Sequence, residues 1–420
     1  MGFREGNLGA LGHGIRHRTT ITTCLLMAVF FVCYTNREFL RFPVEHELST
    51  ALDDHPPNTL KLSDVQGVST VSGDHPANSL TLSDAQCTAL FPHAFDEIEL
   101  ALSRGPVKRS LDKITNGHVR ARIYNGALYL TDRGLDVWHR QSAILHQIHR
   151  AIVTAPSPSE LPNINFEFSV NDHPSGDVWS LARSDADKQV HNTWLMPDFG
   201  FWSWPEPHIG SLDEVHDRII KTEGSMTWEE KESKAVWRGT VKWNKGLRGK
   251  LLDVAWDRPW SDVQRLNWSS NALAMEDFCR YKYLIYTEGV TYSGRLRYFQ
   301  MCRSIIITPE LKWHQTTSPL IRSAGPDQNI VIVKDDWSDL AETIEYLEAN
   351  PEHAERVANN TVRTFRDWYL RPAVETCYWR KLFRAWAHVT PPVGQLYPEE
   401  RGTRWESFIL MHRLHWGKNA

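Results

Sequence analysis

The sequence predicts an α/β protein with two cores and a cleft between them. Its 420 residues are long for one core, because domains commonly hold ~100–200 residues. From Cys87 onward, strand-like and helix-like stretches alternate. In the second half, strand, helix and strand follow one another at a spacing typical of a parallel sheet with crossover helices.

The charge balance excludes a global attraction for nucleic acid. Forty-seven basic residues stand against 51 acidic ones, a net charge of −4. Any anion site must therefore be a local cluster of cations. Tryptophan is unusually common, at 18 residues, and an indole either fills a core or stacks on the apolar face of a sugar ring.

The N-terminus predicts a membrane anchor. Residues 19–34, TTITTCLLMAVFFVCY, carry no charge and follow three arginines. As a helix they span roughly 24 Å, somewhat short of a ~30 Å hydrocarbon core. A cleavable signal peptide is the alternative, but no small-x-small site follows the apolar run. We expect a cytosolic tail at 1–18, a signal anchor at 19–36 and a lumenal remainder.

Residues 37–86 predict a stem. DHPPNTLKLSDVQ at 54–66 recurs as DHPANSLTLSDAQ at 74–86. Both copies are polar and lack a wide apolar face, which is typical of a spacer and not of a solenoid with three or more stacked units. A folded hairpin extension is the alternative.

The first lobe is expected at 87–220. ARIYNGALYL (121–130) alternates like a hairpin, GLDVWHRQSAILHQIHRAIVTA has helical apolar spacing, and INFEFSV (164–170) is a strand ending in the polar turn NDHPSGD. Asp172 in this turn is the candidate general base, because a carboxylate at the end of a buried strand can accept a proton from an attacking hydroxyl. An Asx-turn or a helix cap is the alternative.

The second lobe is expected at 221–390, before a tail at 391–420 without a readable motif. Thr227 and Glu230 form a capping-box pattern before the helix-like EEKESKA. The strand-like runs AVWRG, YKYLIYTEG, SIIIT and NIVIV follow, with the helix-like GRLRYFQMC between the second and third. SDLAETIEYLEAN and VETCYWRKLFRAWAHV read as later helices.

The stretch YTEGVTYSGRLRYFQMC (286–302) predicts a diphosphate-binding loop. Gly289, Ser293 and Gly294 let backbone amides approach an oxyanion, and the start of the following helix adds about half an elementary charge. Arg295 in the first turn can direct its guanidinium onto two phosphate oxygens. A solvated face is the alternative.

More cations surround the strand that ends at Trp237-Arg238-Gly239. The following KWNKGLRGK supplies four: Lys242, Lys245, Arg248 and Lys250. Their convergence on one cleft, in a chain that is acidic overall, favours a phosphate site.

No metal site is expected. Asp185 and Asp187 have a spacing that can share a divalent ion, but no apolar strand precedes them, and Arg183 and Lys188 lie nearby, so a solvated loop is the better interpretation. Three histidines of this region are too irregularly spaced for a ligand set: His173, His191 and His208.

Cysteine usage indicates an oxidising compartment. Cys24 and Cys33 fall in the apolar run, and an even number remains, which allows three pairings: Cys87, Cys279, Cys302 and Cys377. Glycosylation sequons at Asn267 and Asn359 fit a lumenal glycoprotein.

Taken in order, several stretches resemble glycosyltransferase family 90, which includes fungal capsule-associated glycosyltransferases and animal protein O-glucosyltransferases of the Rumi type. They are FEFSVNDHP, TWLMPDFGFWSWP, VWRGT, DFCRYKYLIYTEGVTYSGRLRYFQMCRSIII and CYW. The resemblance runs from about Cys87 to Val389. It implies a GT-B-like fold, with two Rossmann-like lobes and a cleft, behind the N-terminal membrane anchor.

The resemblance also implies an inverting transferase that moves xylose or glucose from a UDP-sugar to a glycan or protein hydroxyl. Asp172 of the Asp-x-Pro turn corresponds to the family's base. The donor site corresponds to Arg238, Gly239, Arg248, Ser293, Gly294 and Arg295. KWNKGLRGK differs in spacing from the animal members. The family's disulfides correspond to Cys279–Cys302 and Cys87–Cys377.

The expected cofactor and partner set follows. The UDP-sugar is a substrate, and neither a permanently bound cofactor nor a divalent metal is expected. The partners are UDP-xylose or UDP-glucose, a glycan or glycoprotein acceptor, and a membrane through the N-terminal helix, without nucleic acid. YSGR favours xylose and a glycan acceptor.

Three indoles wall the sugar pocket or pack in a core: Trp202, Trp204 and Trp237. Because no retrieval signal ends the chain, the expected location is the Golgi (or ER) membrane, single-pass type II, with a lumenal catalytic part. A non-catalytic glycan-binding membrane protein that keeps the fold is the alternative function, and a metal-dependent enzyme using Asp185 and Asp187 is a third.

Overall fold

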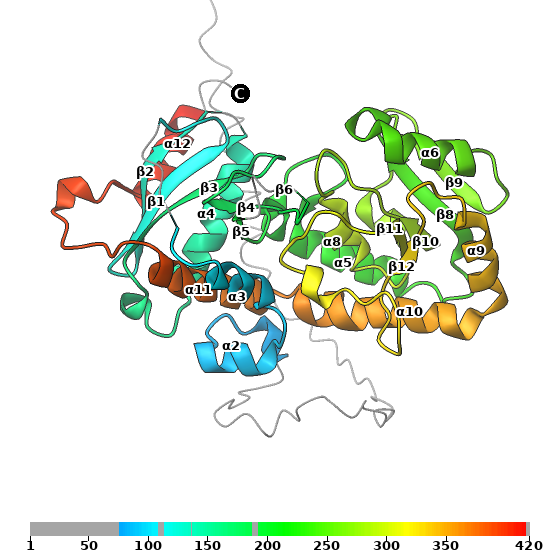
Figure 1. Ribbon diagram of the computed structural model, residues 1–420, viewed down its shortest axis with the longest axis horizontal. Helices are drawn as coiled ribbons and strands as arrows, with labels where there is room; N and C mark the ends of the chain where they lie inside the picture. Colours follow the sequence, from blue (N-terminus) through cyan, green and yellow to red (C-terminus); the bar gives the residue numbers. More distant parts are fainter. Residues whose placement is uncertain (1–74, 108–112, 136, 187–191, 417–420) are drawn as a thin grey trace, which may run out of the picture. The chain divides into compact units, whose positions relative to one another are not determined.

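The computed structural model describes residues 75–107, 113–135, 137–186 and 192–416 (Figure 1). Two sheets organise this part of the chain, one of six strands and one of five, and a two-stranded hairpin lies outside both. The predicted mixed α/β class is therefore confirmed.

The first sheet has the strand order β13-β2-β1-β3-β4-β5. β1 is antiparallel to β2 and to β3, whereas β3, β4 and β5 are parallel. This mixed sheet differs from the Rossmann-like first lobe expected from the resemblance. The strands are β1 His118–Tyr124, β2 Ala127–Arg133, β3 Ile164–Ser169, β4 Trp179–Ser180, β5 Trp194–Leu195 and β13 Thr403–Arg404.

The expected hairpin forms between β1 and β2. Asn125 and Gly126 join the strands with φ angles of 49° and 68°. Two successive positive φ values suit the tight turn whose twist matches that of the flanking strands. The core of this sheet packs against four helices: α2 Asp84–Leu90, α3 Asp96–Ser103, α4 Trp138–Val153 and α11 Pro372–Val389.

The second sheet is entirely parallel, with the order β12-β11-β10-β8-β9, which confirms the parallel sheet predicted for the second half. The strands are β8 Glu232–Gly239, β9 Ser261–Arg265, β10 Tyr281–Ile285, β11 Ile305–Pro309 and β12 Val331–Val333. The helices of this part are α5 Leu212–Glu223, α6 Lys245–Ala255, α7 Met275–Phe278, α8 Arg295–Phe299, α9 Leu340–Ala349 and α10 Pro351–Thr364.

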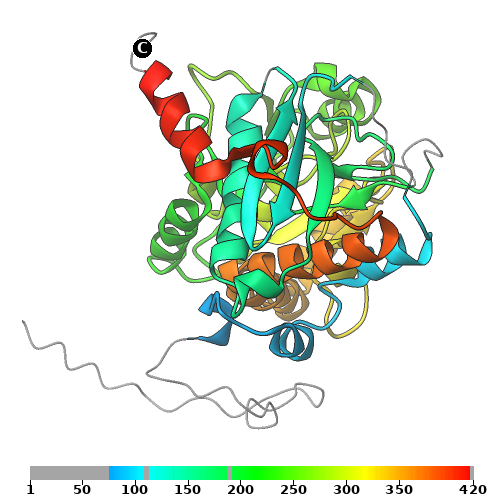
Figure 2. The ribbon, with the colours of Figure 1, turned by 90° about the vertical axis from the view of Figure 1, so that its left-hand side faces the viewer.

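The C-terminal segments return to the first sheet, as Figure 2 shows. α10 ends in a π-helical turn, Phe365–Tyr369, after which α11 packs in the first core. β13 pairs with β2, and Trp405, the first residue of α12 (Trp405–Trp416), is buried. The packing therefore differs from the expected lobe boundaries: α11 joins the first core, the tail adds a strand to it, and α5 contributes to the second core.

Both expected disulfides are confirmed. Cys87 on α2 pairs with Cys377 on α11, 290 residues away. Cys279 pairs with Cys302 across 23 residues, a span that contains β10, the following loop and α8.

The predicted Golgi (or ER) membrane localisation is corrected. It required a membrane-spanning helix, and within residues 75–416, gaps aside, no helix combines the length and the apolar character needed to cross a bilayer. The segments assigned to the anchor (19–36) and to most of the stem lie outside the described residues. The membrane localisation is withdrawn.

Candidate active site

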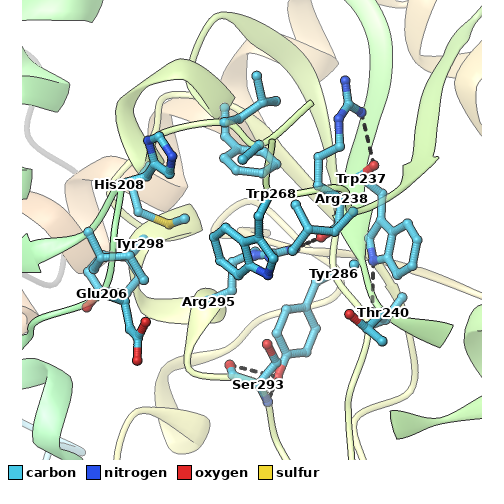
Figure 3. Close-up of a pocket in the computed structure, with 18 of the residues that line it drawn as sticks. Glu206, His208, Trp237, Arg238, Thr240, Trp268, Tyr286, Ser293, Arg295 and Tyr298 are labelled. Carbon is cyan, nitrogen blue, oxygen red and sulfur yellow. Dashed lines mark hydrogen bonds between the residues drawn. The ribbon is translucent and has the colours of Figure 1, made fainter. Parts of the chain in front are cut away.

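A cavity of about 370 Å³ lies at the carboxyl ends of the parallel strands of the second sheet. Residues that end or follow β8, β9 and β10 line it, and this edge of a parallel sheet is where α/β proteins bind ligands. Figure 3 shows the labelled side chains around it, with His208 and Tyr298 on one side and Trp237 and Arg238 on the other.

Arg295, at the start of α8, lines this cavity without a carboxylate partner among the described residues. Its Nη1 donates to the backbone carbonyl of Arg238, and its guanidinium lies 5.3 Å from the ring centre of Phe278. Burial, followed by the charge of Arg248, lowers the pKa of Arg295 to about 10. Arg295 is half-buried and borders the cavity, so part of its charged side chain remains accessible.

Arg248, on α6, is the second cation of the cavity. It is buried, and among the described residues it donates only to backbone carbonyls: Nε to Glu288 at 3.1 Å, Nη1 to Thr240 at 2.9 Å and Nη2 to Thr287 at 3.4 Å. Burial lowers its pKa. Of the four cations expected from KWNKGLRGK, Arg248 lines the cavity, whereas Lys242, Lys245 and Lys250 do not.

Arg238 has a different environment, although it also lines the cavity. Its Nη2 donates to both carboxylate oxygens of Asp262, at 2.9 and 2.8 Å, and its Nε donates to the carbonyl of Asn271. This ion pair joins β8 to β9. Gly239 follows where an added Cβ would lie 2.4 Å from the Trp237 ring, so the close approach of that indole requires glycine.

Aromatic side chains contact the loop at both Ser293 and Gly294. The Ser293 amide donates to the hydroxyl of Tyr286 at 2.8 Å, so this N–H already has a partner. A Cβ at Gly294 would lie 3.0 Å from the indole of Trp204. α8 has only five residues, shorter than the helix expected over GRLRYFQMC. The cationic character of this site therefore comes from the guanidinium groups more than from loop amides or a helix dipole.

Two of the three expected indoles line the cavity, Trp204 and Trp237. Trp237 is buried and donates from Nε1 to Thr287 Oγ1 at 3.0 Å. Trp202 lines a separate cavity and stacks on His146 with ring centres 5.1 Å apart. Further lining residues were not predicted from the sequence: Glu206, His208, Trp243, Trp268, Tyr286 and Tyr298. Most of them follow a strand or belong to the SWPEPH turn, a position that the sequence shows, whereas Tyr298 lies within α8.

Asp172 follows β3, as expected, and its side chain is 57% exposed. The carboxylate accepts a 2.8 Å hydrogen bond from Arg140 Nη1. Asp172 is not among the residues that line the cavity of Arg295. It is connected to the residues around that cavity through its backbone, because its carbonyl accepts a 2.7 Å hydrogen bond from Thr291 Oγ1, in the loop that leads to Ser293.

A partly buried hydrogen-bond chain that the sequence did not reveal supports the turn of Asp172. Ser175 Oγ lies 3.2 Å from His118 Nε2, whose Nδ1 lies 2.7 Å from Glu167, and Arg120 donates to the same carboxylate at 2.6 Å. Although burial opposes it, the hydrogen bonds from His118 and Arg120 keep the pKa of Glu167 below its usual value. His118 and Arg120 on β1 and Glu167 on β3 alternate with core residues. Because any half-buried strand has this pattern, the sequence did not single them out.

Asp185, one of the two carboxylates considered for a metal, has other partners. Asp185 forms ion pairs with Arg183 and, at 3.0 Å, with His314. Asp187 and His191 lie outside the described residues, and within the described part no group of three or more His, Cys, Asp or Glu side chains has a metal-binding arrangement. His173 is exposed, and His208 lines the cavity.

Comparison with known proteins identifies the family. The family model described as Glycosyl transferase family 90 matches residues 83–392. Human Protein O-glucosyltransferase 1 is 23% identical over 245 residues, which cover 53% of this chain and 62% of that protein. The O-glucosyltransferase rumi homolog of Aedes aegypti is 28% identical over 247 residues, 53% of this chain and 58% of that protein.

A longer match exists to O-glucosyltransferase rumi of Drosophila melanogaster, 21% identical over 314 residues that cover 67% of this chain and 72% of that protein. The chain thus spans about six tenths of the length of the first two relatives. These matches confirm the resemblance read from the sequence and, at the level of the family, the glycosyltransferase class.

Proposed function

Because the chain belongs to glycosyl transferase family 90, we propose that it is an inverting glycosyltransferase that moves a sugar from a UDP-sugar to a hydroxyl group. One observation carries this proposal. Arg295 and Arg248 line the same cavity, and neither has a carboxylate partner in the described part of the chain. Arg248 is buried and Arg295 is half-buried. Cations removed from water are costly unless an anion pairs with them, and a diphosphate is the anion that completes the site.

The two guanidinium groups stabilise the charge that develops on UDP as the bond between the sugar and the diphosphate breaks. Donors that are fixed before the reaction supply this stabilisation without reorganisation. Arg238 holds the end of β8 to Asp262 and presents its own carbonyl to Arg295. With two arginines on the diphosphate, the proposed mechanism requires no divalent metal.

The carboxylate of Asp172 takes the proton of the acceptor hydroxyl as that oxygen forms its bond to the anomeric carbon. UDP leaves from the opposite face, so one displacement inverts the anomeric centre. We propose that the two sheets act as the two parts of a GT-B-like enzyme, with the base on the first and the donor site on the second. The bond from Thr291 to the Asp172 carbonyl supports this pairing of the parts.

We propose UDP-glucose as the donor, since the three relatives are named O-glucosyltransferases. Xylose, which the sequence favoured, lacks a hydroxymethyl group, and one or two pocket side chains can decide between the two sugars. The acceptor is a glycan or protein hydroxyl. Two disulfides support action in an oxidising compartment such as the secretory pathway.

The test is release of UDP from a panel of UDP-sugars by the purified protein, with and without candidate acceptors. We expect turnover with UDP-glucose in the presence of EDTA. Binding of UDP without release from any donor would instead support the non-catalytic glycan-binding alternative, and loss of turnover in EDTA would support a metal-dependent enzyme.

A further inference from the structure

We propose that the segment carrying Ser293 and Arg295 is fastened at both ends to the part of the chain built on the first sheet, and that these two contacts set the position of the base relative to the leaving group. The contacts are Thr291 with Asp172 and Arg297 with Asp198. Thr291, Arg297 and Asp198 thereby become positioning residues. This inference rests on the proposed function, which uses Asp172 and Arg295.

The first contact is a single hydrogen bond in a buried place. Thr291 is only 2% exposed, and its hydroxyl donates to the carbonyl of Asp172 at 2.7 Å. The Thr291 carbonyl in turn accepts from the amide of Gly289 at 2.8 Å, which fixes the loop in a tight turn. The backbone of the proposed base is therefore bonded directly to the loop of the donor site.

The second contact is a buried ion pair. Arg297 and Asp198 are 5% and 3% exposed, and Arg297 Nη2 donates to Asp198 Oδ2. The other carboxylate oxygen accepts from the Gly200 amide at 2.7 Å, and the Asp198 carbonyl accepts from Gln147 on α4 at 3.0 Å. Asp198 is thus held in the part of the chain built on the first sheet by contacts that do not involve Arg297.

The turn after Asp198 is shaped to receive this arginine. A Cβ at Gly200 would lie 2.1 Å from Arg297 Nη1, so a larger residue at that position would displace the guanidinium. The Arg297 guanidinium also lies 4.4 Å from the ring centre of Phe201. Trp204 of the same segment packs against Gly294, which places a third contact between the two fastening points.

Neither Thr291 nor Arg297 lines the cavity, so neither is expected to touch the donor. Their effect on catalysis must pass through the placement of Asp172 and Arg295. A displacement of about 1 Å of reacting groups can cost about 100-fold in rate. Loss of the Thr291 bond should therefore reduce kcat while UDP affinity is preserved.

The experiment compares Thr291→Val with Thr291→Ser in the full chain. Valine keeps the volume of threonine and removes the hydroxyl, whereas serine keeps the hydroxyl. We expect kcat for transfer to fall about ten- to 100-fold in Thr291→Val, with the Kd for UDP within about twofold of wild type and the melting temperature little changed. Thr291→Ser should restore most of kcat.

Other results overturn the inference. An unchanged kcat in Thr291→Val, a parallel loss of kcat and UDP affinity, or no rescue by serine would each reject a positioning role. Arg297→Lys, which keeps the charge and loses the planar fork, should lower kcat in the same way, and Thr291→Val decides if Arg297→Lys does not fold. If wild type releases no UDP from any UDP-sugar, the proposed function fails and the inference with it; an active wild type with a normal Thr291→Val variant rejects the inference alone.

Discussion

The hydroxyl of Thr291 donates a 2.7 Å hydrogen bond to the backbone carbonyl of Asp172. This bond joins the turn after β3 to the loop after β10, two segments separated by 119 residues. It connects the turn of Asp172, whose carboxylate pairs with Arg140, to a loop that ends at an arginine without an acidic partner in the described chain.

Asp172→Asn should abolish transfer and leave UDP binding intact. The amide cannot accept the acceptor proton, but its oxygen can still accept the hydrogen bond from Arg140. Removal of a general base costs about 10²–10⁴-fold in rate. The measurement is kcat for transfer beside UDP affinity by calorimetry. Asp177→Asn, in the same turn, is the matched control and should retain activity. A loss of UDP affinity in Asp172→Asn would show that Asp172 contributes to UDP binding and would contradict its role as the base.

Arg295→Ala should weaken UDP binding strongly. Hydrogen bonds to charged groups contribute about 1.5–3 kcal/mol, so we expect the Kd for UDP to rise at least tenfold. Uridine, which lacks the diphosphate, should bind wild type and variant alike. Arg280→Ala is a suitable control because Arg280 pairs with Asp277 outside the cavity. An unchanged affinity for UDP would reject Arg295 as a phosphate ligand.

The Cys279–Cys302 disulfide should stabilise the donor loop that it encloses. A disulfide that closes a loop of about this length destabilises the unfolded chain by about 3 kcal/mol. The double variant with serine at both positions should lose about that much free energy of unfolding and should bind UDP more weakly, because β10 and α8 frame the loop. Denaturant unfolding and calorimetry measure the two effects. A UDP affinity equal to that of wild type would show that packing alone holds the loop.

Glu288 should make the protein less stable as the pH rises. Burial raises its pKa to about 7, although the amides of Lys312 and Trp313 donate to its carboxylate. The unfolded chain releases this proton near pH 4.3, while the folded protein keeps it until about pH 7. Stability therefore falls between these two pH values and is lowest above them. Glu288→Gln should flatten this part of a melting-temperature profile; an unchanged slope would assign it to other groups.

Secondary structure was predicted best where the local residue pattern is compatible with only one kind of strand or turn. The turn at Asn125 and Gly126 and the apolar runs of β10 and β11 read directly from the sequence. EEKESKA did not form a helix: the bond from the Thr227 amide to Glu230 exists at 2.7 Å, but it closes a turn, and β8 begins at Glu232. The second half of β8 is buried in the sheet. Its strand pairing outweighs the helical preference of the exposed residues at the start of the strand.

The position of a candidate residue could be predicted where it follows a strand in the sequence. Arg295 and Asp172 follow strands, and that position was visible in the sequence. The pairing of Arg238 with Asp262 was not, because it depends on how β8 aligns with β9. Trp202 lines a separate cavity. This was not predictable either, because the side chains of an irregular segment follow no fixed period. The same holds for the tail, whose two-residue β13 is too short to leave a pattern.

The most direct test of the account is a crystal structure of the protein with UDP. We expect the diphosphate in the cavity at the ends of β8 and β10, with its oxygens within hydrogen-bonding distance of the guanidinium groups of Arg295 and Arg248. UDP bound at any other surface, or in this cavity with its diphosphate turned away from both arginines, would contradict the account.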